Sequence, residues 1–237
     1  MKPYKITVMG EDFLLFSQEN SRGLCDVQCD LSNVIGLLPS IAADFSLIGY
    51  TKRKKTLSDY RAAAISAAAF LIIERGLPLT ELLFETPLGN IEVFYTDSGL
   101  FEIRTQKCKH IITNSVEVMG CNTVCTDICS DSLFRVIYTE NIKNFDLNIL
   151  SRLVSIGERT PSAVVLYSAK DSEIDFRSYT DYNPSPPSAV SLFAAVSYAE
   201  FLRNHASEFR FGTSFCRLAY GGATVSLKPE IYKEEFT

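Results

Sequence analysis

The pattern of hydrophobic and polar positions divides the chain into strand-like and helix-like segments. Alternating or short apolar runs bounded by Gly or charged residues predict strands in the first half at 2–8, 13–16, 45–50, 82–85, 89–95 and 99–104. The same signals predict strands in the second half at 124–128, 134–138, 163–168, 174–179, 209–211, 216–220 and 223–227. Residues 17–43 follow neither period and are predicted to be irregular.

Two strongly apolar segments predict buried helices. The first covers 58–75, with Ser58 as a candidate N-cap and Gly76 as the residue that stops it. The second covers 187–204, and a shorter helix with one apolar face is predicted at 146–155. The two long helices are apolar on every side, so each must be surrounded by protein.

The two long helices begin segments that echo each other about one half-chain apart. Residues 61–93 and 188–227 each read as a small-residue helix, a strand, a Gly-containing turn and another strand. This order predicts an internal duplication of an α/β unit. The expected domains are residues 1–115 and 116–237.

Composition and charge narrow the function classes. A hydrophobic content of 46% with sixteen Phe suits a packed core, and the net charge of −5 excludes the basic face of a nucleic-acid binder. The longest apolar run, 62–73, is too short to span a bilayer, so no membrane association is expected. Glu11 and Asp12 interrupt the first apolar stretch, so no signal peptide is expected, and the odd number of seven Cys favours reduced thiols in the cytoplasm.

Several separated motifs resemble one known family. Gly10-Glu11-Asp12-Phe13 is similar to a Gly-Asn-Asp-Phe signature, and Glu74-Arg75-Gly76-Leu77 is similar to a helix end that reads Lys-Gly-Leu. The following run, Glu-Thr-Pro-Leu-Gly-Asn-Ile-Glu at 85–92, matches Glu-Thr-Pro-x-Gly-x-Ile-Glu. In order and spacing these motifs resemble the diaminopimelate epimerases, which are cofactor-independent amino-acid epimerases and racemases.

The resemblance implies an α/β (α+β) fold with two pseudo-symmetric domains, each a curled sheet around a central helix. In that family two facing Cys residues, one at each helix start, exchange the α-proton of an amino acid without a cofactor. Backbone N–H groups at the helix starts hold the substrate carboxylate. No cofactor and no metal are therefore expected here.

The chain departs from the family at both helix starts. The stretch that matches the first catalytic loop, 57–64, has no Cys, and Tyr60 or Arg61 stands at the thiol position. The second loop reads Pro187-Ser188-Ala189-Val190, again without Cys. We therefore expect a catalytically degenerate relative that binds a small molecule or a protein partner in or near the inter-domain cleft.

The alternative is an isomerase with acid and base groups other than Cys. Its candidate catalytic residues are Asp59, Tyr60, Ser188 and Asp181, and its candidate ligand-binding residues are Glu11 and Arg61. Each has a structural interpretation as well. Ser188 is a good helix cap, Asp59 or Asp181 is a good surface partner for Arg61, and Glu11 can pair with Arg61 or a lysine rather than bind a cationic ligand.

A third hypothesis is a structural partner that forms a homodimer or a hetero-oligomer with a homologue. Two sets of Cys at four-residue spacing, Cys25/Cys29 and Cys121/Cys125/Cys129, fit either a zinc site or small buried hydrophobes, and the second interpretation is favoured. His110 is predicted in a basic loop and His205 just after the second long helix, and neither is expected to be catalytic.

Overall fold

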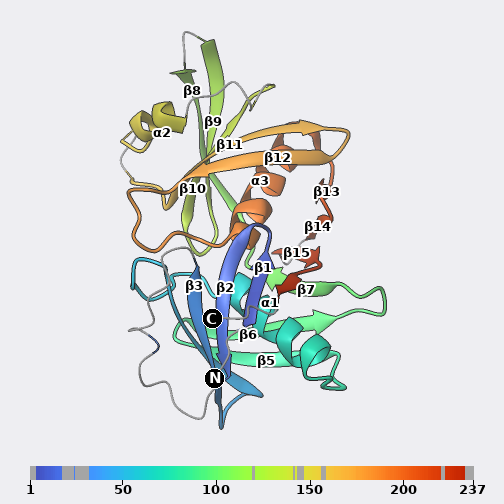
Figure 1. The fold of residues 1–237 in the computed structure, drawn as a ribbon. Helices are drawn as coiled ribbons and strands as arrows, with labels where there is room; N and C mark the ends of the chain where they lie inside the picture. Colours follow the sequence, from blue (N-terminus) through green and yellow to red (C-terminus); the bar gives the residue numbers. More distant parts are fainter. Residues whose placement is uncertain are drawn as a thin grey trace. The chain divides into compact units, whose positions relative to one another are not determined.

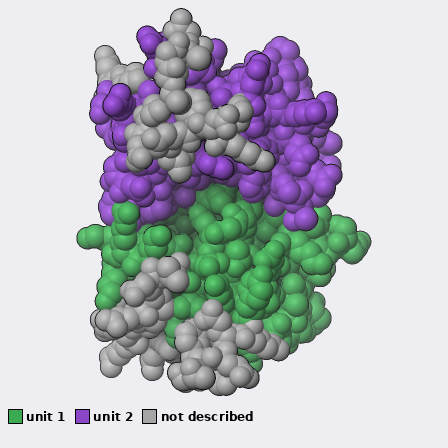
Figure 2. Space-filling model, turned by 45° about the horizontal axis from the view of Figure 1, so that its top comes forward, with its two compact units in different colours: residues 1–104, 188–190, 226–237 green, residues 105–187, 191–225 purple. Residues whose placement is uncertain are grey.

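The computed structural model describes residues 4–17, 24, 32–118, 121–140, 142, 147–155, 159–219 and 222–232. They form two compact units, coloured separately in Figure 2. The first contains residues 1–104, 188–190 and 226–237, and the second contains 105–187 and 191–225. The halves 1–115 and 116–237 stay a prediction of domain organisation.

The first unit is a sheet curled around helix α1 (Arg61–Ala69). The helix contacts β1, β2, β4 and β6, and β1 and β6 lie five places apart in the strand order, so the sheet must bend around it (Figure 1). The strands in spatial order are β16 (Glu230–Tyr232), β1 (Tyr4–Val8), β2 (Glu11–Ser17), β3 (Asn33–Pro39), β4 (Phe45–Tyr50), β5 (Glu81–Thr86), β6 (Gly89–Tyr95) and β7 (Phe101–Thr105).

Small side chains allow α1 to sit at the centre of this sheet. Every residue of the helix except Arg61 is buried, and six of the nine are Ala. The helix continues as a π-helical turn, η2 (Phe70–Glu74), in which the Arg75 N–H donates to the Phe70 carbonyl at 3.0 Å. Gly76 then adopts a φ of 67°, which confirms its expected role in stopping the helix.

The second unit is built around helix α3 (Ala189–Asn204), which continues from the first unit at residue 191. Phe193 of α3 stacks on Phe176 at 6.3 Å and lies 6.0 Å from Phe211. The strands in spatial order are β15 (Gly222–Leu227), β14 (Ser214–Ala219), β13 (Glu208–Phe211), β12 (Glu173–Tyr179), β11 (Ala163–Lys170), β10 (Leu133–Tyr138), β9 (Cys121–Cys129) and β8 (Lys109–Val118).

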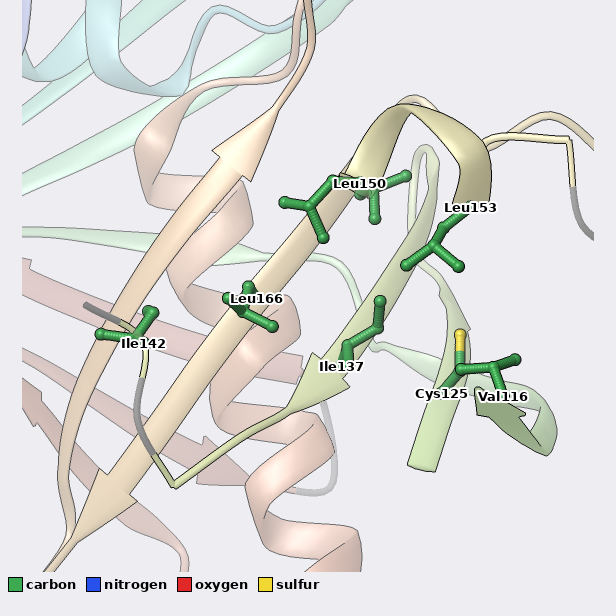
Figure 3. Close-up of a cluster of buried hydrophobic side chains, with 8 residues drawn as sticks. Val116, Cys125, Ile137, Ile142, Leu150, Leu153 and Leu166 are labelled. Atoms are coloured by element: carbon green, nitrogen blue, oxygen red, sulfur yellow. The ribbon is translucent and has the colours of Figure 1, made fainter. Parts of the chain in front are cut away.

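The short helix α2 (Leu147–Leu153) covers a separate apolar cluster in the second unit. Leu150 and Leu153 pack there with Ile137, Leu166 and Cys125 from the sheet (Figure 3). Next to this cluster, Arg135 makes two hydrogen bonds to Asp127, at 2.7 and 2.8 Å, and donates to the Leu153 carbonyl at 2.7 Å. The buried arginine thereby neutralises the buried carboxylate and caps the end of α2.

The two units repeat one order of strand pairings. From β1 to β6 successive neighbours pair antiparallel, parallel, antiparallel, parallel and antiparallel. From β9 to β14 the same order recurs. In both units the long helix falls between the fourth and fifth strands of the repeated set.

Several sequence-based expectations need correction. Residues 17–43 contain the strand β3, which pairs parallel with β2 and antiparallel with β4. The first helix begins at Arg61 with Tyr60 at the N-cap position, so Ser58 is not the cap. His110 lies on strand β8 rather than in a loop, and its ring hydrogen-bonds the Thr113 hydroxyl at 2.8 Å. None of the helices in the described ranges has the length and apolar content that crossing a bilayer requires.

Candidate functional site

Two helix starts that are far apart in the sequence meet within the first unit. Asp59 lies just before α1, and Ser188 lies just before α3 in the segment 188–190 that belongs to this unit. The Asp59 Oδ2 accepts hydrogen bonds from the Ser188 N–H at 3.1 Å and from the Ser188 hydroxyl at 2.7 Å. One carboxylate oxygen therefore joins the start of α1 to the start of α3.

The second oxygen of Asp59 serves its own helix. Oδ1 accepts from the Arg61 N–H and from the Arg61 guanidinium, both at 3.1 Å. Only 6% of the Asp59 side chain and 15% of the Arg61 side chain are exposed. The predicted ion pair between these residues exists, but it is a largely buried pair joined by two hydrogen bonds rather than a surface contact.

Glu11 brings a second carboxyl group to the start of α3. It is the first residue of β2, and its Oε1 accepts a hydrogen bond from the Ala189 N–H at 2.9 Å. Burial raises the pKa of Glu11 to about 8, the Ala189 hydrogen bond opposes this rise, and the nearby Asp59 carboxyl adds to it. Near neutral pH a proton thus resides on Glu11 for much of the time.

These contacts determine what the start of α3 can bind. The first N–H groups of a helix have no partner within the helix and form a ready anion site. Here Asp59 accepts a hydrogen bond from the Ser188 N–H, and Glu11 accepts one from the Ala189 N–H. A substrate carboxylate at these two donors has to displace two carboxyl groups that the protein itself holds in place.

Tyr60, another predicted site residue, faces the sheet. Its hydroxyl accepts from the Gly49 N–H at 3.1 Å and lies 3.4 Å from the Gly49 carbonyl, and the residue is 1% exposed. Burial raises the pKa of this hydroxyl. The contacts give Tyr60 the structural task of fixing α1 to β4.

Asp181 lies apart from this group in the assignment of compact units. It belongs to the second unit, in an exposed turn that follows β12. The residues that the first unit brings together are Glu11, Asp59, Arg61 and Ser188, with the backbone of Ala189. Sequence reasoning named the four side chains but missed Ala189, because it acts through its N–H and leaves no signal in residue type.

Among the described cysteines, Cys108, Cys125 and Cys216 are buried, and Cys129 is partly buried. Cys125 belongs to the cluster under α2, and burial raises its pKa to about 12 (Figure 3). Burial likewise raises the pKa of Cys216 to about 12. Thiols of this kind carry little thiolate at neutral pH. Cys25 and Cys29 lie outside the described residues, as does the side chain of Cys121.

Both histidines belong to the second unit, outside this group. The His205 N–H donates to the Phe201 carbonyl at 2.8 Å with a φ of 62°, so this residue ends α3. Within the ranges that the structure describes, no three His, Cys, Asp or Glu side chains gather as metal ligands.

Comparison with known proteins identifies the fold. No protein-family model and no curated protein matches the chain. Among solved structures, a Clostridium difficile protein described as a PhzC/PhzF phenazine biosynthesis protein is 12% identical with a TM-score of 0.74, and 100% of this chain aligns with 99% of it. A PhzF-family protein from Enterococcus faecalis is 12% identical with a TM-score of 0.71, over 98% of this chain and 97% of its own.

An epimerase aligns over the full length as well. The hydroxyproline epimerase from Agrobacterium vitis, solved with trans-4-hydroxy-L-proline, is 12% identical with a TM-score of 0.61, over 98% of this chain and 90% of its own. At such identity the likeness establishes the fold alone. The chain therefore has the α/β diaminopimelate epimerase-like fold that these phenazine biosynthesis proteins and epimerases share.

Proposed function

We propose that this chain is a catalytically degenerate protein of the epimerase-like fold, which binds a small molecule or a protein partner without performing epimerisation. One observation carries the proposal: Asp59 and Glu11 occupy the Ser188 and Ala189 N–H groups. In the epimerases that the chain resembles, such groups hold the substrate carboxylate. The protein's own carboxyl groups fill that position here, so a substrate carboxylate would have to displace them.

The residues at the two thiol positions support the same conclusion. Proton exchange at an α-carbon needs a base and an acid whose pKa values lie near neutrality. Tyr60 is bound to the Gly49 backbone, Arg61 is paired with Asp59, and the Ser188 hydroxyl donates to Asp59. None of these three groups has a thiol's capacity to take up and release a proton at neutral pH.

The repeated order of strand pairings supports an internal duplication as the origin of the two units. Two unrelated halves would have no reason to repeat five successive pairing directions around one helix each. We propose that the architecture of a two-site ancestor persisted while the chemistry at its centre was replaced.

The alternative function, an isomerase with carboxyl acid and base groups, has one observation in its favour. Glu11 and Asp59 are two carboxyl groups in different environments, and the pKa of Glu11 lies near 8. A carboxyl group whose pKa is raised toward neutrality is typical of acid–base catalysis. For catalysis Glu11 would have to release Ala189 and reach a substrate α-proton.

Deuterium wash-in at the α-carbon separates the two functions. We would incubate the protein in D₂O with proline, trans-4-hydroxyproline, diaminopimelate, glutamate and aspartate, with an active epimerase as the positive control. The proposal predicts no exchange above the uncatalysed rate. Exchange that is present in the wild type and lost in Glu11→Gln would establish the isomerase and overturn the non-catalytic function.

The assembly and location remain proposals with simple tests. We propose a homodimer or a hetero-oligomer with a homologue in a reducing cytoplasm. Light scattering after size exclusion measures the mass directly. A monomer across the accessible concentration range would contradict the homodimer, and failure of the homologue to co-elute would contradict the hetero-oligomer.

A further inference from the structure

The second unit contains a pocket of about 440 Å³ that lies outside the group formed by Glu11, Asp59, Arg61 and Ser188. Its walls come from the later turns of α3, from β14, from the start of β15 and from residues 107–108. The volume falls within the range of small-molecule sites, roughly 300–1,000 Å³. The residues that decide its chemistry are Lys107, Tyr198, Phe201, Ser207, Leu218 and Ala219.

The wall formed by α3 is aromatic. The rings of Tyr198 and Phe201 stack with centroids 6.1 Å apart and an interplanar angle of 26°. His205 meets Phe201 edge-on at 6.1 Å. Leu218 and Ala219 of β14 supply aliphatic surface. Such a wall favours a flat or branched apolar group, because it buries apolar surface and offers ring faces for stacking.

Three polar side chains of the pocket are uncommitted. Among the described residues, no hydrogen bond or ion pair involves the Lys107 ammonium, the Tyr198 hydroxyl or the Ser207 hydroxyl. All three can donate a hydrogen bond, one is a cation, and no acidic residue is among the described residues that line the pocket. The polar part of the pocket therefore suits an anion.

The backbone around Lys107 is held in place by a close approach. A Cβ on Gly222 would lie 2.2 Å from the Thr105 carbonyl oxygen and 3.3 Å from the Lys107 nitrogen. Only glycine permits the start of β15 to lie so close to residues 105–107. This contact fixes the base of the Lys107 side chain beside the apolar wall, so that charge and apolar surface form one site.

We propose that this pocket binds an amphipathic carboxylate, namely a small molecule with an aromatic or branched apolar body and one carboxylate group. The body packs on Phe201 and Leu218, and the carboxylate accepts hydrogen bonds from Lys107 and the neighbouring hydroxyls. The inference rests on the proposed binding function and gives its ligand class. It does not involve the two helix starts.

The test uses 3-phenylpropionate and its neutral analogue 3-phenylpropionamide as probes, with binding followed by isothermal titration and saturation-transfer NMR on the full chain. The acid is expected to bind with a dissociation constant on the order of millimolar or below. The amide is expected to bind at least about fivefold more weakly, because it has no charge for Lys107 to attract.

Three variants locate the site. Lys107→Met should weaken binding of the acid about fivefold and leave binding of the amide unchanged. The control is Lys170→Met, at a lysine of the same unit outside the pocket, which should change the binding of neither probe. Ala219→Phe should abolish binding of both probes by filling the space. Ala219 is exposed, so this variant keeps the core intact.

Equal binding of acid and amide, no saturable binding by either, or full binding in Ala219→Phe would overturn the proposed pocket. The deuterium wash-in is read separately. If neither α-proton exchange nor probe binding is observed, only the proposed pocket is contradicted. If both are observed, only the proposed non-catalytic function is contradicted.

Discussion

At the residue scale, one buried carboxylate organises the candidate site. Asp59 accepts four hydrogen bonds, two from Arg61 and two from Ser188. The sequence indicated an ion pair between Asp59 and Arg61, because acid and base stand two positions apart. It named Ser188 as a candidate but could not pair it with Asp59, since this contact joins residues 129 positions apart and forms only once the fold exists.

Removal of this carboxylate should cost stability. Asp59→Ala removes a largely buried carboxylate that accepts hydrogen bonds from Arg61 and Ser188, and we expect the free energy of unfolding to fall by about 3 kcal/mol in urea titrations. Asp97→Ala, at an exposed position, is the matched control and should change the free energy by less than about 0.5 kcal/mol. A loss in Asp59→Ala no larger than in the control would show that the four hydrogen bonds contribute little.

Glu11 makes stability depend on pH in a defined direction. Its pKa in the folded protein, about 8, lies above the ordinary value of 4.5, so the folded state holds the proton more tightly. The contribution of Glu11 to the free energy of unfolding is fully present below pH 4.5 and is lost as the pH rises through about 8. The slope is at most about 1.4 kcal/mol per pH unit.

Urea unfolding of the wild type and of Glu11→Gln at pH 5, 6, 7 and 8 isolates this contribution. The variant has no titrating group at position 11, so the stability of the wild type should fall relative to it over this range. A difference between the two proteins that stays constant with pH, or that grows in the wild type's favour, would contradict the raised pKa of Glu11.

At the element scale, the sequence pattern located most strands and helices, and the exceptions have physical reasons. The strand at 45–50 was predicted with its observed bounds, because a short, mostly apolar run there lies between Asp44 and the polar residues that begin at Thr51. β3 was missed because Gly36 and Pro39 weaken its signal. β8 was missed because residues 109–115 are exposed, so no buried face imposes an alternating pattern.

Glycine positions give an element-scale prediction. Gly222 and Gly89 both have positive φ, of 140° and 115°, but a Cβ at Gly89 would meet no atom within 4 Å. Gly89→Ala should therefore cost only backbone strain, about 1–2 kcal/mol. Gly222→Ala adds a clash with the Thr105 carbonyl and should cost about 2 kcal/mol more, measured as the difference in free energy of unfolding.

Equal losses in the two glycine variants would contradict the close approach of β15 to residues 105–107. A smaller loss of unfolding free energy in Gly222→Ala than in Gly89→Ala would contradict this close approach more strongly. In either case the argument that this contact fixes Lys107 at the pocket would fail with it.

At the scale of the whole molecule, the fold was more predictable than the site. Buried helices with small residues, the echo of 61–93 in 188–227 and the family-like motifs all reflect packing, which constrains many residues at once. The solved structures share the fold at 12% identity for the same reason. The site depends on a few contacts, and one of its donors, the Ala189 N–H, is a backbone group that any residue except proline provides.

The account's central claim is that internal carboxyl groups occupy the start of α3. The most direct measurement is the amide chemical shift of Ala189 by NMR as the pH is raised from 5 to 9 in the wild type and in Glu11→Gln. We predict a titration with a midpoint near pH 8 in the wild type, none in the variant, and no shift on addition of trans-4-hydroxyproline. A wild-type Ala189 amide that does not titrate, or that moves when the amino acid is added, would contradict the claim.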